Sequence, residues 1–114
     1  MKIKETIHGD VVVITLSGKM MLDAKSENLH YYVKDLIGKG YSKIVIDMGK
    51  ITWFGSTGLG ALLASYTSLK EADGDLKIAR ATRKIRSVFM FTQLIKVLKN
   101  YDSVDAALSS FSKG

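Results

Sequence analysis

Two adjacent hydroxyl side chains, Ser56 and Thr57, stand where phosphate chemistry is expected. The apolar run at residues 44–46 predicts a buried strand, and the apolar residues from Leu59 onward predict a helix. The hydroxyl pair therefore falls at the expected first turn of that helix. Unpaired backbone N–H groups and the positive end of the helix dipole meet there and favour a phosphate. A hydroxyl at this position can cap the helix, bind a phosphate or become phosphorylated, and the local pattern leaves all three open.

Several kinds of enzyme site lack necessary residues in this chain. The glycines around Ser56 match neither the dinucleotide-binding nor the P-loop motif, and G-x-S-x-G is unmet because Ser56 directly follows Gly55. His8 and His30 are isolated histidines, which are more often surface or satisfied residues than bases. Asp47 is the carboxylate nearest in sequence to the hydroxyl pair, but it lacks a recognisable partner for general-base chemistry. We expect no enzyme, and hence no catalytic residue, metal site or cofactor.

Length and composition favour one globular domain spanning residues 1–114. The chain is 46% hydrophobic and 25% charged, and it has no cysteine for a disulfide or a thiolate metal site. No apolar run approaches the ~20 residues of a membrane span, and residues 1–7 lack the apolar stretch of a secretory signal. We expect a cytoplasmic protein.

The net charge of +6 raises the question of an acidic partner. The densest basic group is Lys77, Arg80, Arg83, Lys84 and Arg86, followed by Lys96 and Lys99. Phe89 and Phe91 lie in an apolar run and are more simply core residues than platforms for stacking bases. A solvated face is the first interpretation and an acidic protein partner the second, and we expect neither nucleic acid nor membrane as a partner.

The order of apolar patterns predicts alternating strands and helices. A hairpin is expected from strands at residues 2–7 and 11–16 around a turn at 8–10, followed by a loop at 19–24. Further strands are expected at 43–47 and 76–79, and the apolar segment 94–98 is expected to include one more. Four helices are predicted by apolar residues at helical spacing, and the last begins at a cap on Asp102 or Ser103. The four sets are Leu29, Val33, Leu36 and Ile37; Leu59, Leu62, Leu63 and Tyr66; Ile85, Val88 and Phe89; and Val104, Ala107, Leu108 and Phe111.

These elements predict an α/β fold. The strand–helix–strand unit at residues 43–80 is a crossover, so its two strands should be parallel neighbours. The opening hairpin makes the sheet mixed. We expect a mixed sheet of four to five strands, with a hairpin first and a parallel centre, covered by about four α-helices.

The whole chain resembles the STAS-domain anti-sigma factor antagonists of bacteria. The resemblance rests on residues 54–60, Phe-Gly-Ser-Thr-Gly-Leu-Gly, which open the helix after the central strand. Supporting matches are Gly18 after the second strand, the run at 76–78 after Gly74, and the two runs at 101–103 and 106–108. The resemblance covers roughly residues 2 to 112 and implies a single STAS-type domain.

The resemblance also implies a function in bacterial signalling and transcription regulation. It implies partner switching, in which the protein binds an anti-sigma factor that is also a serine kinase and thereby releases a sigma factor. Phosphorylation would abolish binding, because about two negative charges enter the contact surface. The phosphorylated residue would be Ser56, with Thr57 as second choice, and a phosphatase would reverse the change. The partner-binding residues would be Trp53, Phe54, Gly55, Ser56, Thr57, Gly58, Leu59 and Gly60 in a monomer or weak dimer.

Two positions depart from the family pattern. Gly55 replaces the family's aspartate, which can cap the helix, so Ser56 could take over capping. Asp23 stands later than the acidic residue that many phosphorylated members carry after the glycine. The change at Gly55 keeps open the alternative of a STAS scaffold or relay subunit that is not phosphorylated. The glycines at a helix N-terminus keep open a second alternative, a nucleotide-binding STAS domain.

Overall fold

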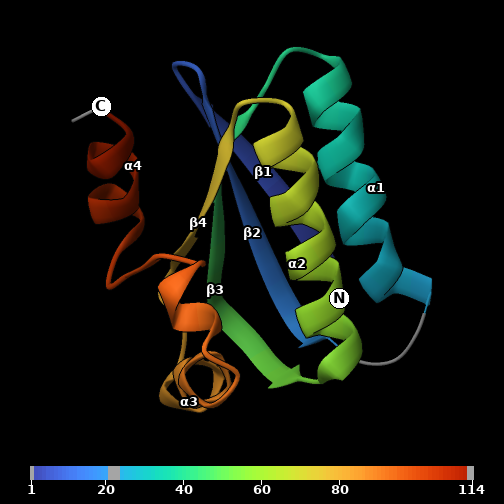
Figure 1. Cartoon of the computed structure of the whole chain (residues 1–114), viewed down its shortest axis with the longest axis vertical. Helices are drawn as coiled ribbons and strands as arrows, with labels where there is room; N and C mark the ends of the chain where they lie inside the picture. Colours follow the sequence, from blue (N-terminus) through green and yellow to red (C-terminus); the bar gives the residue numbers. More distant parts are fainter. Residues whose placement is uncertain (1, 21–23, 113–114) are drawn as a thin grey trace.

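The computed structural model describes residues 2–20 and 24–112 and shows one five-stranded sheet with helices around it (Figure 1). The elements in chain order are β1 (Lys2–His8), β2 (Val11–Met20), α1 (Ala24–Gly38), β3 (Lys43–Phe54), α2 (Ser56–Glu71), β4 (Asp75–Ala79), α3 (Arg83–Phe91), the 3₁₀ turn η1 (Leu94–Lys96), β5 (Asn100–Tyr101) and α4 (Val104–Ser112).

The sheet has the mixed topology that the sequence predicts. Its strand order is β1-β2-β3-β4-β5; β1 and β2 are antiparallel, and every other neighbouring pair is parallel. Gly9 supplies the positive φ of 64° that the tight hairpin turn requires. The crossover through α2 places β3 and β4 side by side as parallel strands, as expected.

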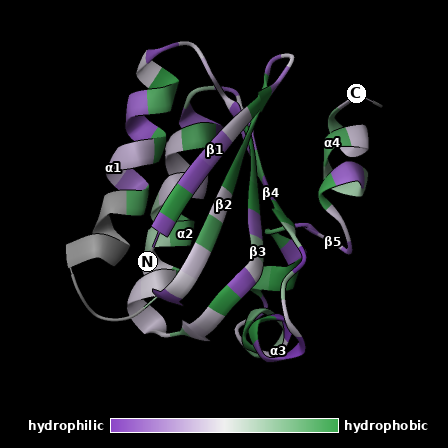
Figure 2. Ribbon diagram, turned by 180° about the vertical axis from the view of Figure 1, so that it is seen from behind, coloured by the Kyte–Doolittle hydropathy of each residue, from purple (hydrophilic) through white to green (hydrophobic). Residues whose placement is uncertain are grey.

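Helices cover both faces of the sheet, which explains the continuous apolar runs at residues 11–14 of β2 and 44–46 of β3. In β2, Val12, Ile14 and Leu16 join the larger core cluster beneath α1 and α2, while Val11 and Val13 join the smaller cluster beneath α4. The two views agree that α1 and α2 share one face and that α4 stands apart on the other (Figures 1 and 2). Strands buried on both faces read as continuous apolar runs because neither side meets water.

The prediction of a strand within residues 94–98 is wrong. This stretch forms the 3₁₀ turn η1, and the final strand is the two-residue β5 that follows it. Gln93 takes the left-handed conformation after α3 and reverses the chain. Leu98 is then buried and Leu94 packs partly on the core, so the apolar pattern arises from a turn anchored at two points rather than from an extended strand.

Two strands are longer than expected, and the structure shows which residue caps α4. β2 runs to Met20 instead of Leu16, and β3 runs to Phe54 instead of Asp47. The two strands continue to pair with each other beyond the end of β4, across register shifts near Gly18, whose φ is 94°. At α4 the cap is Ser103, whose Oγ accepts a hydrogen bond from the Ala106 N–H at 3.0 Å. Asp23 lies outside the described residues.

Candidate functional site

The candidate site forms where β3 extends past its neighbour β4 and turns into α2. The last β3–β4 pair joins Asp47 to Ala79, whereas pairing with β2 continues to Phe54. The Gly55 N–H then donates a 2.9 Å hydrogen bond to the Met20 carbonyl. The turn that carries the hydroxyl pair is thereby fixed to the end of β2, at the lower end of the molecule in Figure 1.

The start of α2 has no side-chain cap. Gly55 is the N-cap residue in extended conformation, with φ −107° and ψ −180°, and its carbonyl accepts the first intrahelical hydrogen bond from the Leu59 N–H at 3.1 Å. Helix geometry leaves the amides of Ser56, Thr57 and Gly58 without intrahelical acceptors. The first turn contains no acidic residue. The positive end of the helix dipole is therefore not offset by a side chain of its own first turn.

Ser56 is the first residue of α2 and is exposed, while Thr57 is half-buried. The possibility that Ser56 caps the helix is wrong, because Gly55 holds that position. The structure gives the Ser56 hydroxyl no hydrogen bond to any group that it describes. Of the two hydroxyls, Ser56 is the one that a second protein can reach without displacing neighbouring residues.

The two aromatic residues before the turn point in different directions. Trp53 is 58% exposed, whereas Phe54 packs on the core and makes an edge-to-face contact with Phe89 at 6.0 Å between ring centroids. The strand alternation explains the difference, since successive side chains lie on opposite sides. Of these two expected partner-binding residues, Trp53 is the one presented to solvent.

The two glycines of the motif differ in their surroundings. A Cβ on Gly58 would lie 3.1 Å from the Met20 Cβ and 3.2 Å from Phe54 Cε1, so Gly58 permits close packing of α2 against the ends of β2 and β3. A Cβ on Gly60 would meet no atom within 4 Å, so packing within this chain does not require glycine at that position. Leu59 packs partly against the core. Gly60 is exposed.

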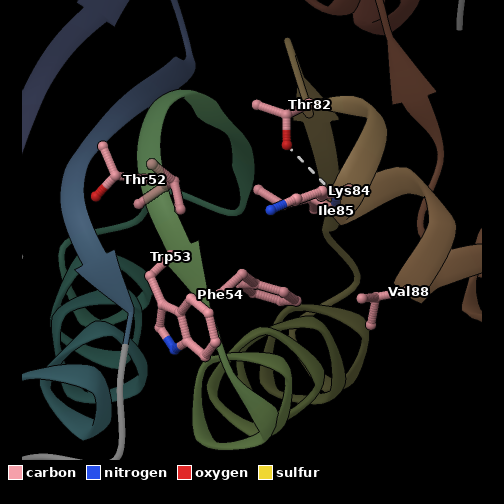
Figure 3. A pocket seen from close by; sticks show the side chains of 8 residues that line it. Thr52, Trp53, Phe54, Thr82, Lys84, Ile85 and Val88 are labelled. Carbon is pink, nitrogen blue, oxygen red and sulfur yellow. Dashed lines mark hydrogen bonds between the residues drawn. The ribbon is translucent and has the colours of Figure 1, made fainter.

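A pocket of about 280 Å³ lies beside the site, between the end of β3 and α3 (Figure 3). Ile51, Thr52, Trp53 and Phe54 line it from the strand, and Thr82, Lys84, Ile85 and Val88 line it from the other side. Thr82 caps α3 by accepting a hydrogen bond from the Ile85 N–H at 3.4 Å. Sequence reasoning missed this half of the site because it lies about thirty residues away in the chain. The capping threonine followed by Arg83 and Lys84 was the available signal.

Asp47 and the two histidines, which the sequence analysis considered for catalysis, either make contacts within the fold or lie away from Ser56. The Asp47 Oδ1 lies 3.3 Å from Arg80 Nε and accepts a hydrogen bond from the Gly49 N–H at 3.0 Å. His30 Nε2 lies 2.9 Å from Ser68 Oγ, between α1 and α2, and His8 ends β1 at the hairpin turn. No group of three metal-binding side chains occurs within residues 2–20 and 29–112, whose side chains the structure describes. None of the helices described there has the length and apolar character needed to cross a membrane.

Comparison with known proteins finds a family model and several relatives. The model of the STAS domain matches residues 2–107. A protein of Bordetella bronchiseptica, named "Putative anti-sigma factor antagonist BtrV", is 24% identical over 102 residues, which cover 90% of this chain and 88% of the relative.

Two solved structures have the same fold. The crystal structure of an anti-sigma factor antagonist from Mycobacterium paratuberculosis superposes with a TM-score of 0.83 at 24% identity, covering 96% of this chain and 92% of that one. The unphosphorylated anti-sigma factor antagonist SpoIIAA gives a TM-score of 0.76 at 20% identity, with 99% of each chain covered.

Proposed function

The chain belongs to the STAS domain family, and from this membership we propose that it is an anti-sigma factor antagonist. It binds an anti-sigma factor through residues 53–60, and this binding releases a sigma factor. The observation that carries the proposal is the exposed Ser56 at the uncapped, positive end of α2, next to the exposed Trp53. The similarity to relatives named as antagonists supports it.

The proposed switch is phosphorylation of Ser56 by the same partner, acting as a serine kinase in the cytoplasm. A phosphoserine brings about two negative charges and three acceptor oxygens. The free amides of the first turn of α2 would stabilise that charge within this protein. A partner that closes over the phosphate would have to desolvate it without a matching cation, and this penalty breaks the complex. A phosphatase resets the cycle.

The test mixes the purified protein with each serine kinase of the histidine-kinase-like ATPase class from the same organism, with ADP or with ATP. We expect a stable complex with ADP and its loss with ATP, together with one phosphate on Ser56. Ser56→Ala should bind and remain bound with ATP, whereas Thr57→Ala, the neighbouring hydroxyl control, should behave as wild type. A chain that binds none of these kinases in either nucleotide state would refute the proposal.

A second candidate, a scaffold or relay subunit that is never phosphorylated, is favoured by one observation. Gly55 leaves the presentation of Ser56 without the aspartate that other family members carry. Mass spectrometry of the protein from growing and from stressed cells separates the two candidates. Unmodified Ser56 under both conditions supports the scaffold, and a change in its phosphorylation supports the switch.

A further inference from the structure

The positive charge of the protein is concentrated in one segment. Residues 76–101 contain seven of the seventeen lysines and arginines and none of the eleven acidic residues. The rest of the chain holds ten basic and eleven acidic residues and is therefore close to neutral. This segment includes α3 and η1, which lie at the same end of the molecule as the start of α2 (Figure 1).

Three of the seven cations already serve the fold. Arg80 pairs with Asp47, Arg86 Nη2 lies 2.7 Å from Asp102 Oδ1, and the buried Lys77 donates to Ser110 Oγ beneath α4. The other four are Arg83, Lys84, Lys96 and Lys99, all exposed. Within the described residues, no ion pair involves any of these four. Their charge faces outward over the exposed side of residues 83–99, which we term the basic face.

Large apolar side chains are exposed among these cations. Phe91 is 90% exposed, Met90 65%, Val97 40% and Ile95 37%, so the prediction that Phe91 is a core residue is wrong, whereas Phe89 is buried. Leaving apolar side chains of this size in water forgoes the favourable free energy of their burial. α3 is not loosely held, because Ile85 and Phe89 are buried in the core and Thr82 caps its start. The apolar residues are thus presented to solvent by an anchored helix.

We propose that the basic face binds an acidic surface of the same anti-sigma factor that contacts Ser56. This inference rests on the proposed function and specifies its partner. The basic face is continuous with the Ser56 site, because one pocket is lined by Trp53 and Phe54 on one side and by Lys84 and Val88 on the other (Figure 3). The partner surface carries carboxylates opposite the four cations and apolar side chains opposite Phe91 and this pocket.

An acidic protein fits both the cations and the exposed apolar side chains of the basic face better than nucleic acid or an anionic membrane does. Nucleic acid would neutralise the cations but would leave Met90, Ile95 and Val97 against a charged backbone. An anionic bilayer would accept the cations and the protruding apolar side chains but would leave the concave pocket beside Trp53 unfilled. An acidic partner also makes the switch at Ser56 stronger, because a phosphate there meets partner carboxylates as well as desolvation.

The experiment uses the anti-sigma factor kinase that binds the wild-type protein in the test above. Association and dissociation rates are measured at low and at high salt for Lys84→Glu/Lys99→Glu and for Phe91→Ser. Lys34→Glu on α1 and Ile7→Ser on β1 are the matched controls, since both residues are exposed and lie away from α3. All four variants should melt as wild type because the substituted side chains are exposed.

We expect the double reversal to slow association by about tenfold or more and to flatten its salt dependence. Phe91→Ser should speed dissociation by about tenfold or more, as loss of an interface aromatic does. The controls should change neither rate by more than about twofold. A complex that forms with wild-type kinetics in both variants overturns the inference alone, whereas failure of every kinase to bind wild type overturns the proposed function. Tighter binding to phosphatidylglycerol vesicles or to duplex DNA than to the kinase also overturns the inference.

Discussion

Replacing Gly55 by aspartate should stabilise the protein, because the glycine leaves α2 without a side-chain cap. The backbone at Gly55 is extended, a conformation open to every residue. An added Cβ would lie 3.5 Å from Trp53 Nε1 and 3.6 Å from the Met20 carbonyl oxygen, both ordinary contacts. The new carboxylate would reach the free amides of the first turn without any rearrangement of the chain.

Three contributions set the size of the effect. Aspartate is a better cap than glycine by a few tenths of a kcal/mol. Its charge gains about 0.3–1 kcal/mol from the helix dipole. Loss of the glycine's freedom in the unfolded chain adds about 0.4–1 kcal/mol. The sum is about 1–2 kcal/mol, which for a domain of this size corresponds to a rise in Tm of about 4–8 °C in calorimetry.

Two further substitutions at the same position separate these contributions. Gly55→Asn keeps a capping oxygen without the charge and should fall between wild type and Gly55→Asp. Gly55→Ala provides neither cap nor charge and should stay close to wild type, since its gain in unfolded-state entropy is offset by poor capping. A Tm for Gly55→Asp equal to or below that of wild type would refute the description of this helix start.

Three other positions give predictions for stability. Gly60→Ala should raise Tm because an exposed helical glycine costs about 1 kcal/mol relative to alanine. Gly58→Ala should lower Tm, since atoms of Met20 and Phe54 lie 3.1–3.3 Å from the new Cβ and their crowding outweighs the same gain. Gln93→Gly should stabilise by about 1 kcal/mol in urea unfolding, because its φ of 63° is unfavourable for a residue with a side chain. Partial burial and then a hydrogen bond to a nearby carboxylate raise the pKa of Tyr32 to about 12. The neutral Tyr32 hydroxyl therefore contributes its full stabilisation below about pH 10, and this contribution is lost as the pH rises towards 12. Tyr32→Phe removes this titration and should lose less stability between about pH 10 and 12 than Tyr31→Phe, a control at the exposed neighbouring residue that keeps Tyr32.

The order of strands and helices could be predicted from the chain because burial imposes a simple pattern. The inner parts of β2 and β3 are buried on both faces and therefore appear as continuous apolar runs at residues 11–14 and 44–46. The segment at 94–98 misled the prediction because a turn with two inward leucines has the same composition as a short strand. The chain reverses at Gln93, which adopts a left-handed conformation. A glycine at this position would have indicated the turn, but the sequence has glutamine there.

Only half of the candidate site could be predicted. Ser56 and its neighbours lie in one continuous motif, and the end of a strand followed by a helix predicts their position. The other wall of the pocket comes from Thr82, Lys84 and Val88, which meet Trp53 only because β3 extends beyond β4. That extension depends on pairing with β2 across irregular register, which no local pattern encodes. The inward turn of Phe54 follows from the same extension.

The most direct test of the central claim is a paired measurement on Ser56→Asp: affinity for the anti-sigma factor kinase and thermal stability of the free protein. The charge should bind the positive end of α2 favourably, by about 0.3–1 kcal/mol, so Tm should be unchanged or slightly raised. The same charge should weaken the complex by several times that free energy, because it must be desolvated under the partner. Weakened binding with an intact melting transition is the predicted result. Binding as tight as wild type would contradict the charge switch, and weakened binding together with loss of the melting transition would mean that Ser56 has a structural role instead.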